Sequence, residues 1–351
     1  MTNNEVRKDY LLNRWVVIAK ERKKRPLDFV KKKVTEKQSA CPFCPNNEHM
    51  TPPAVLAYLV SDRGLKKEKD RNDLCHKNWT VRVVPNAYPA FSPPDEETLF
   101  IETAVLKKAV GHHEVFIESS CHDEHPGNAR VSQLVYVINA YLDRMTAISR
   151  NSYVKSATIF RNHGQEAGAS LTHAHSQLIA TPFIPRILEE ELAASKSFWT
   201  QNNECLLCGV LEKEKQGPRS IWENSSFVVF APWASVNAFE FWVLPKRHQS
   251  NMLTMSGPEI QDLAEVMRVC LGALRSLLND PPYNFGFHTL LKENGEECYH
   301  WHLEVYPRLT IWAGFEKSAG IFINTVLPED AAKELEKAVK VEQNFFGRSE
   351  H

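Results

Sequence analysis

The chain has 351 residues, a formal net charge of -1 at pH 7 and 43% hydrophobic residues. This length is enough for one large domain or for two half-size domains, each with its own core. The near-neutral charge argues against a nucleic-acid-binding surface, which is usually basic. No run of 18 apolar residues predicts a membrane span, and the N-terminus lacks the apolar core of a signal peptide. We therefore expect a cytoplasmic protein with neither nucleic-acid nor membrane partners.

The first half of the chain opens with a C-x-x-C motif formed by Cys41 and Cys44. In the cytosol, where thiols stay reduced, such a pair favours metal binding over a disulfide. Downstream, runs of valine, isoleucine and phenylalanine predict strands, and apolar residues at helical spacing predict one long helix. The expected elements are strands over residues 79–91, 113–122 and 156–160 and a helix over residues 131–148, followed by His173-Ala174-His175.

The second half repeats this order of elements. A C-x-x-C motif, Cys205 to Cys208, precedes two expected strands, a long helix, a third strand and the sequence His300-Trp301-His302. Ser256 and Glu259 are spaced as a capping box at the start of the helix. The expected elements are strands over residues 222–235, 239–248 and 283–291, a helix over residues 259–278 and a further helix that begins at Pro328.

The two halves also agree in spacing. The second expected strand of each half ends in a histidine, and the intervals from His122 to His173 and from His248 to His300 differ by one residue. An internal duplication explains this agreement better than chance does. Strands grouped around one long helix per half indicate an α+β fold with antiparallel sheet rather than a parallel, doubly wound one. The predicted domains are residues 1–195 and 196–351.

Each half supplies the four side chains of a tetrahedral zinc site. Two thiolates on a tight turn and two histidines at matched distances suit zinc better than a redox dithiol, which needs a thioredoxin-like context. Cys121, His112, His113 and His125 lie near His122 and compete with it as ligands. The predicted ligands are Cys41, Cys44, His122 and His173 for the first site and Cys205, Cys208, His248 and His300 for the second.

The densest cluster of reactive and small residues lies at residues 161–177, RNHGQEAGASLTHAHSQ. Its glycines and serine let backbone N–H groups and a hydroxyl approach phosphate oxygens closely. In an extended stretch His173 and His175 face the same side, so a metal ligand and a second imidazole lie together beside this loop. A neutral imidazole is a good nucleophile toward phosphorus near pH 7, and the amide of Gln177 can donate to a phosphoryl oxygen. We therefore predict His175 as the nucleophile and Gln177 as its catalytic partner.

This segment resembles the active-site motif of the galactose-1-phosphate uridylyltransferase family, a branch of the histidine-triad superfamily that includes ADP-glucose phosphorylase-like members. The resemblance covers nearly the whole chain, through RWVVIAKERKKRP, CPFC, VVPNAYPAF, NHGQEAGASLTHAHSQ, HWHLEVYP and WAGFE. The family motif H-P-H-G-Q reads His173-Ala174-His175-Ser176-Gln177 here, so its proline and glycine are replaced. The resemblance implies a homodimer whose chains each contain two tandem histidine-triad-like half-domains, each a mainly antiparallel sheet with a long helix.

The resemblance also implies substrate-binding roles. Two arginines are expected at the phosphates, an asparagine at the nucleoside, the small-residue loop at phosphate oxygens and a C-terminal segment at the sugar hydroxyls. In that order, the residues are Arg22 and Arg25, Asn86, then Asn162, Gly168, Ala169 and Ser170, and finally Gly314, Phe315 and Glu316. Some family members build the second metal site from a glutamate and three histidines, which Glu191, His248, His300 and His302 match. The pair Cys205 and Cys208 favours the Cys₂His₂ set instead and leaves His302 aside.

Together these features predict a hexose-1-phosphate nucleotidylyltransferase of the UDP-glucose–galactose-1-phosphate uridylyltransferase type. It would act by ping-pong kinetics through a covalent nucleotidyl-histidine, with a nucleotide sugar and a sugar 1-phosphate as substrates. The first alternative is an ADP-glucose phosphorylase that transfers AMP to phosphate. A histidine-triad hydrolase is disfavoured, because Gln177 stands where a third histidine would protonate the leaving group. A non-enzymatic zinc module leaves the loop cluster unexplained.

Overall fold

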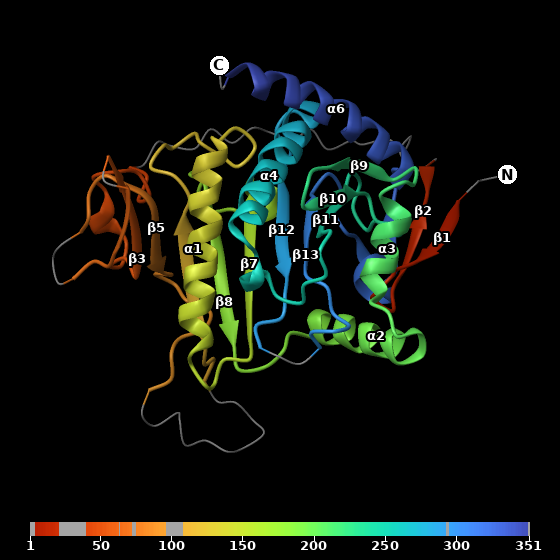
Figure 1. The fold of residues 1–351 in the computed structure, drawn as a ribbon, viewed down its shortest axis with the longest axis horizontal. Helices are drawn as coiled ribbons and strands as arrows, with labels where there is room; N and C mark the ends of the chain where they lie inside the picture. The colour runs from red at the N-terminus through yellow and green to blue at the C-terminus, as the bar shows by residue number, and fades with distance from the viewer. Residues whose placement is uncertain are drawn as a thin grey trace.

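One continuous antiparallel sheet runs through the middle of the molecule (Figure 1). The computed structural model describes residues 4–20, 40–62, 64–71, 75–95, 108–292 and 295–349, the last five by their backbone only. Within these residues the sheet has eleven strands. In spatial order they are β4 (Gly64–Glu68), β3 (Leu56–Ser61), β5 (Trp79–Pro85), β6 (His112–Ile117), β8 (His175–Thr181), β7 (Ser156–His163), β12 (Tyr283–His288), β13 (His302–Pro307), β11 (Phe241–Pro245), β10 (Phe227–Phe230) and β9 (Ser220–Glu223).

The order of the central strands shows that the chain is built from two similar halves. The order β5-β6-β8-β7 in the first half is mirrored by β12-β13-β11-β10 in the second, and the halves join where β7 pairs with β12. Each H-x-H motif ends at the first residue of an inner strand, His175 in β8 and His302 in β13. The predicted α+β fold with two antiparallel half-domains is therefore confirmed.

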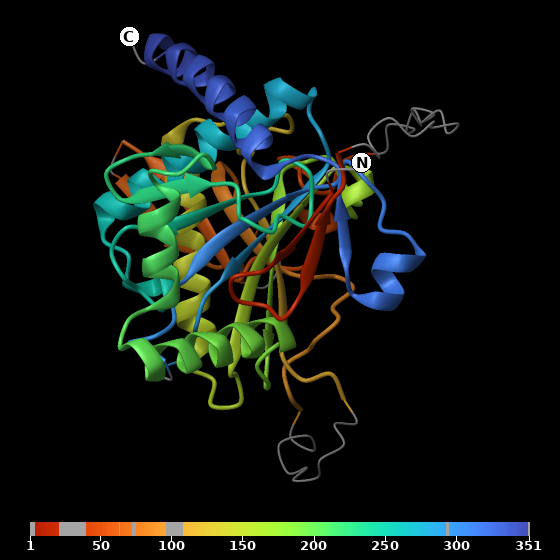
Figure 2. The ribbon, with the colours of Figure 1, turned by 90° about the vertical axis from the view of Figure 1, so that its right-hand side faces the viewer.

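Two long helices cover one face of this sheet (Figures 1 and 2). α1 (Val131–Ser149) and α4 (Gly257–Leu278) contact each other and bury apolar side chains against alternate residues of the strands, which makes the main core. Leu178 and Ala180 of β8 point into that core. His175 and Gln177 occupy the alternate positions of the same strand, so they face the opposite side of the sheet.

A small second sheet lies beside the second half. β1 (Glu5–Lys8) and β2 (Trp15–Ile18) form an antiparallel pair, and β14 (Phe322–Asn324) adds to β2 in parallel. The remaining helices are α2 (Arg186–Asn202), α3 (Leu206–Glu214), α5 (Gly314–Ala319) and α6 (Pro328–Ser349), and the short 3₁₀ turns are η2 (Glu48–Met50), η4 (Gln165–Ala167) and η5 (Met252–Thr254). α6 packs along α4 at the top of Figure 1. Among the residues described, no helix is long and apolar enough to cross a bilayer.

The three predicted helices are all present. α1 and α4 lie where the helical spacing placed them, and α6 begins at Pro328. Ser256 caps α4 through the predicted capping box, since its backbone N–H donates to the carboxylate of Glu259 at 2.7 Å while its hydroxyl accepts from the backbone N–H of Glu259.

Several predicted strand bounds are wrong. The strand expected over residues 79–91 ends at Pro85, and the strand expected over residues 222–235 is divided by a turn into β9 and β10. The strands expected to end at His122 and His248 stop earlier, at Ile117 and Pro245, because the chain leaves the sheet there and carries each histidine to a cysteine pair. The predicted domain boundary, after residue 195, falls inside α2, which links the two halves.

Candidate active site and metal centres

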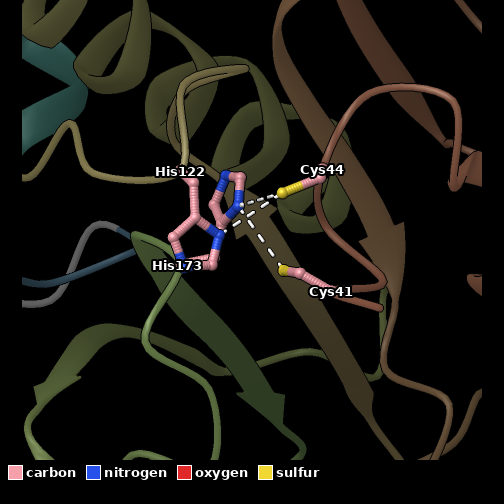
Figure 3. A group of neighbouring side chains, drawn as sticks. All are labelled: Cys41, Cys44, His122 and His173. Atoms are coloured by element: carbon pink, nitrogen blue, oxygen red, sulfur yellow. Dashed lines mark hydrogen bonds between the residues drawn. The ribbon is translucent and has the colours of Figure 1, made fainter. Parts of the chain in front are cut away.

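The four predicted ligands of the first metal site come together in the structure (Figure 3). Cys41 and Cys44 lie on a tight turn, in which the backbone N–H of Cys44 donates to the carbonyl of Cys41 at 3.2 Å. His122 lies in the loop after β6, and His173 lies just before β8. The Sγ atom of Cys44 is 3.3 Å from Nδ1 of His122 and 3.6 Å from Nδ1 of His173, and Sγ of Cys41 is 3.6 Å from the latter atom.

The geometry and protonation of this cluster fit a zinc ion. Nε2 of His173 lies 2.8 Å from the carbonyl oxygen of Ser119, which only accepts, so Nε2 carries the hydrogen and Nδ1 turns its lone pair to the sulfurs. Burial and the neighbouring Cys41 raise the pKa of the Cys44 thiol to about 11, so its thiolate form needs a nearby cation. Tetrahedral zinc, with bonds of about 2.0 Å to nitrogen and about 2.3 Å to sulfur, holds these atoms roughly 3.5 Å apart, as observed.

The second predicted set also assembles. Cys205 precedes α3 and Cys208 lies in its first turn, so the helix start brings both sulfurs to one side. The Sγ atom of Cys208 is 3.4 Å from Nδ1 of His248 and 3.4 Å from Nδ1 of His300. Nε2 of His248 donates to the carbonyl of Glu296 at 2.7 Å, which again leaves the Nδ1 lone pair facing the sulfurs. This cluster therefore has the same Cys₂His₂ arrangement as the first.

Two residues of the alternative metal set belong to a third cluster. Glu191 and His302 do not join His248 and His300 but lie with two residues that the sequence did not single out, His288 and Glu304. Nδ1 of His288 is 2.8 Å from Glu191, and Nε2 of His302 is 3.1 Å from Glu304. Although burial lowers it, the pKa of His288 rises to about 9 because both carboxylates stabilise the imidazolium. The cluster is thus built around the buried ion pair of His288 with Glu191.

The tautomer of His175 is fixed by one hydrogen bond. Its Nδ1 lies 2.8 Å from the carbonyl oxygen of His173, so Nδ1 carries the hydrogen and Nε2 keeps the lone pair. Burial lowers the pKa of His175, and the positive charge of Arg161 lowers it further, which favours the neutral imidazole. The residue as a whole is 7% exposed. Phe43, between the two cysteines of the first metal site, packs edge-on against it with ring centroids 5.4 Å apart.

The equivalent histidine of the second half is blocked. His302 also directs Nδ1 to a carbonyl two residues earlier, that of His300, at 3.2 Å. Its Nε2 is bonded to Glu304, however, and its ring is fully buried under Trp242, with ring centroids 5.1 Å apart. Of these two equivalent histidines, only His175 offers a free lone pair.

The small-residue loop after β7 has a shape that requires glycine at two positions. Gly164 and Gly168 have φ angles of +82° and +89°, and a Cβ on Gly164 would lie 2.9 Å from Pro282. The backbone N–H groups of Gly168 and Ala169 donate within the loop, to the carbonyls of Gln165 and Gly164. The hydroxyl of Ser170, in contrast, lies on an exposed residue of the loop.

A side chain of the second half is hydrogen-bonded to this loop. Nδ2 of Asn284, on β12, donates at 2.8 Å both to Oδ1 of Asn162 and to the carbonyl of Ala167. Because Oδ1 of Asn162 accepts this bond, its Nδ2 is turned toward Gly168 and stays a donor. A pocket of about 230 Å³ beside the loop is lined by residues of both halves. Among them are Asn162, Ala169 and Ser170 of the first half and Asp280 and Pro282 of the second.

The other predicted substrate residues are distributed unevenly. Asn86 lies beside Gln177, with its Nδ2 3.5 Å from Oε1 of that residue. Gly314, Phe315 and Glu316 lie on α5 next to β14, not on the strands that carry His175. Arg22 and Arg25 lie outside the described residues.

Three polar residues near His175 and Gln177 were not predicted from the sequence. Arg161 and Glu118 form an ion pair, 2% and 3% exposed, on the core side of β8, and Nη1 of Arg161 donates to the carbonyl of His175 at 3.1 Å. His113, on β6, contacts Gln177. The first two break an apolar strand pattern, which is a usable signal for a buried pair. For His113 there was no such signal, because His112 beside it is an identical residue.

A family model described as galactose-1-phosphate uridyl transferase, N-terminal domain, matches residues 1–185 of the chain. The ADP-glucose phosphorylase of Arabidopsis thaliana is 34% identical over 338 residues, which cover 94% of this chain and 91% of the relative. The chain belongs to the galactose-1-phosphate uridylyltransferase family. A galactose-1-phosphate uridylyltransferase of Thermotoga maritima is 27% identical over 342 residues, 94% of this chain and 97% of the relative. A second family model, described as a domain of unknown function, matches residues 122–344.

Solved structures of the galactose-1-phosphate uridylyltransferase family have the same fold. A crystal structure of the Arabidopsis thaliana ADP-glucose phosphorylase with bound ADP-glucose has a TM-score of 0.81 and 31% identity, and covers 95% of this chain and 99% of that chain. A uridylyltransferase structure has a TM-score of 0.73 and 25% identity, and covers 96% and 99%. As predicted, the chain is a nucleotidyltransferase of this family.

Proposed function

We propose that this enzyme transfers a nucleoside monophosphate between phosphates by way of a covalent bond to His175. The observation that carries the proposal is the fixed tautomer of this histidine. The carbonyl of His173 holds the hydrogen on Nδ1, so Nε2 keeps its lone pair, on the face of β8 that points away from the core. Burial keeps the ring neutral, which is the nucleophilic form.

The reaction has two half-reactions. Nε2 of His175 attacks the α-phosphorus of a nucleoside diphosphate hexose, an N–P bond forms, and the bond to the hexose 1-phosphate oxygen breaks with its electron pair on the leaving phosphate. An acceptor phosphate then attacks the same phosphorus, and the N–P bond breaks to restore the neutral imidazole. The amide hydrogens of Gln177, with Asn162 and Ser170, stabilise the negative charge on the phosphoryl oxygens. In this proposal Arg22 and Arg25 bind the phosphates, Asn86 lies at the nucleoside, and Gly314 to Glu316 lie near the sugar.

We further propose that both Cys₂His₂ clusters bind zinc. Thiolates and neutral imidazoles at tetrahedral spacing are the donor set that structural zinc prefers, and four ligands leave no open position for chemistry. Bound zinc fixes the turn that presses Phe43 against His175. The proposal also includes a domain division near residue 195. It further includes a homodimer, and light scattering at several protein concentrations would test that oligomeric state.

Two activities share this chemistry. The sequence favours transfer of UMP from UDP-glucose to galactose 1-phosphate. The comparisons support transfer of AMP from ADP-glucose to phosphate, since the Arabidopsis thaliana ADP-glucose phosphorylase is more similar to the chain than the Thermotoga maritima uridylyltransferase, in the fraction of identical residues. A panel of UDP-glucose with galactose 1-phosphate and ADP-glucose with phosphate, scored by release of glucose 1-phosphate, separates them.

The covalent intermediate is tested by labelling. The protein is mixed with UDP-glucose or ADP-glucose that carries ³²P in the α-phosphate, without acceptor, and acid-labile, base-stable label on the protein is counted. We expect about one label per chain in the wild type and none in His175→Ala, with unchanged zinc content. His49→Ala, which changes an exposed histidine, is the matched control and should label fully. Label retained in His175→Ala would place the nucleophile elsewhere.

A further inference from the structure

His113 contacts the side chains of Gln177 and Asn86 and the backbone of Ala90. It is on β6, opposite Ile179 of the nucleophile strand. Its Nε2 is 2.7 Å from Oε1 of Gln177, and its Nδ1 is 3.0 Å from the backbone nitrogen of Ala90. The same Nε2 is 3.1 Å from Nδ2 of Asn86.

The partners of His113 determine which of its nitrogens carries the hydrogen. A backbone N–H can only donate, so the contact with Ala90 makes Nδ1 an acceptor without hydrogen. In the neutral ring the hydrogen is therefore on Nε2, and Nε2 donates to the side chain of Gln177. Since Nε2 is a donor, the atom of Gln177 that it meets must be the carbonyl oxygen and not the amide nitrogen.

Asn86 reinforces this orientation. The backbone N–H of Tyr88 donates to Oδ1 of Asn86 at 2.8 Å, so the Nδ2 group of Asn86 is turned the other way, toward Oε1 of Gln177 at 3.5 Å. Nδ2 of Asn86 and Nε2 of His113, 3.1 Å apart, are then two donors that share Oε1 of Gln177 as their acceptor. With its oxygen engaged by both, the carboxamide of Gln177 has only its NH₂ group left for the substrate.

We propose that His113 is a positioning residue that fixes the carboxamide of Gln177 with its NH₂ group toward the phosphoryl oxygens. This inference rests on the proposed function, since it deepens the role of Gln177 in nucleotidyl transfer. A flipped carboxamide would set its NH₂ group against the N–H of His113 and its oxygen against the negative phosphoryl oxygens. His113 thus excludes the one orientation of Gln177 that would repel the transition state.

The neighbouring histidine provides a matched control. His112 is on the same strand, but its side chain points to the other face, where its Nε2 meets the hydroxyl of Tyr153 at 2.6 Å and its ring stacks on the tyrosine ring. A His112→Phe variant therefore loses a histidine from β6 without touching Gln177, and we expect it to react at the wild-type rate.

The test is a double-mutant cycle on the rate of covalent labelling. Rapid-quench measurement with α-³²P nucleotide sugar is made on the wild type, His113→Phe, Gln177→Ala and the double variant. From oxyanion-hole precedents, loss of Gln177 should slow labelling by roughly 10²-fold, and misplacement of its amide should slow it on the order of tenfold. We expect His113→Phe to lower the rate constant with little change in the concentration of half-saturation. In the Gln177→Ala background the same change should alter the rate by less than about twofold.

Conservative variants keep the test valid if the phenylalanine disturbs the fold. His113→Gln can accept from Ala90 and donate to Gln177, so it should regain most of the rate, while the shorter His113→Asn should not. Equal losses from His113→Phe with and without Gln177, or an equal loss in His112→Phe, would show a merely structural role and overturn the inference. Absence of label in the wild type would instead overturn the proposed function.

Discussion

Replacing Arg161 by methionine is expected to destabilise the protein by about 3–5 kcal/mol. The guanidinium and the carboxylate of Glu118 are 2% and 3% exposed, so neither charge is stabilised by water. Methionine fills a similar volume and leaves no large cavity, but it leaves the Glu118 carboxylate buried with the hydroxyl of Tyr141, at 2.8 Å, as its side-chain donor. The penalty therefore arises mainly from an uncompensated charge, with a smaller part from the lost bond to the carbonyl of His175.

Urea unfolding of zinc-loaded protein, followed by tryptophan fluorescence, measures this change. Lys67→Met is the matched control, because its ion pair with Asp143 is solvent-exposed and contributes about 0–1 kcal/mol. The double variant Glu118→Gln/Arg161→Met, which removes both charges, should recover at least about half of the loss. A loss below about 1 kcal/mol in Arg161→Met, or a double variant less stable than the single one, would refute the argument from buried charge.

Three further predictions concern metal, pH and helix stability. Cys41→Ala should reduce bound zinc by about one ion per chain. It should also lower the yield of folded protein more than it lowers the labelling rate per folded chain, whereas the control Cys75→Ala should leave zinc content, yield and rate unchanged. Elemental analysis and titration of folded protein measure these changes. Burial raises the pKa of Glu240 to about 7, so the folded state holds a proton that the unfolded chain releases at lower pH. Its contribution to stability is fully present below about pH 4.5 and is lost as pH rises through 7. Glu240→Gln should therefore show a smaller loss of stability between pH 5 and 8 in urea titrations, and an unchanged slope contradicts the raised pKa. Ser256→Ala should lower the free energy of unfolding by about 1 kcal/mol, because the capping box with Glu259 is lost; a change within about 0.3 kcal/mol would exclude it.

The features that were predictable from sequence are those encoded by local patterns or by repetition. The apolar spacing of residues 131–148 and 259–278 reports a buried helix face directly, and Ser256 with Glu259 lies within one turn. The assembly of the two Cys₂His₂ clusters followed from two cysteine pairs with histidines at matched intervals, a pattern whose repetition makes coincidence improbable.

Contacts between distant segments were not predictable. The parallel pairing of β2 with β14 joins residues about 300 positions apart, and no local pattern specifies it. Likewise, which of His112 and His113 faces the site depends on the register of β6 against β8, because a shift of one residue exchanges the two faces. The buried Glu191 on α2 escaped notice as a core residue because it follows two other acidic residues in a charged stretch.

The pairing of β7 with β12 makes the half that contains His175 incomplete on its own. A fragment that ends near residue 195 would expose the hydrogen-bonding edge of β7 and would lack Asn284, which bonds to Asn162 and to the carbonyl of Ala167. Such a fragment would retain His175, but we expect it to self-associate through the exposed edge of β7. The second half therefore supports this loop mechanically, and a substitution in β12 can shift the loop without changing any residue of the first half.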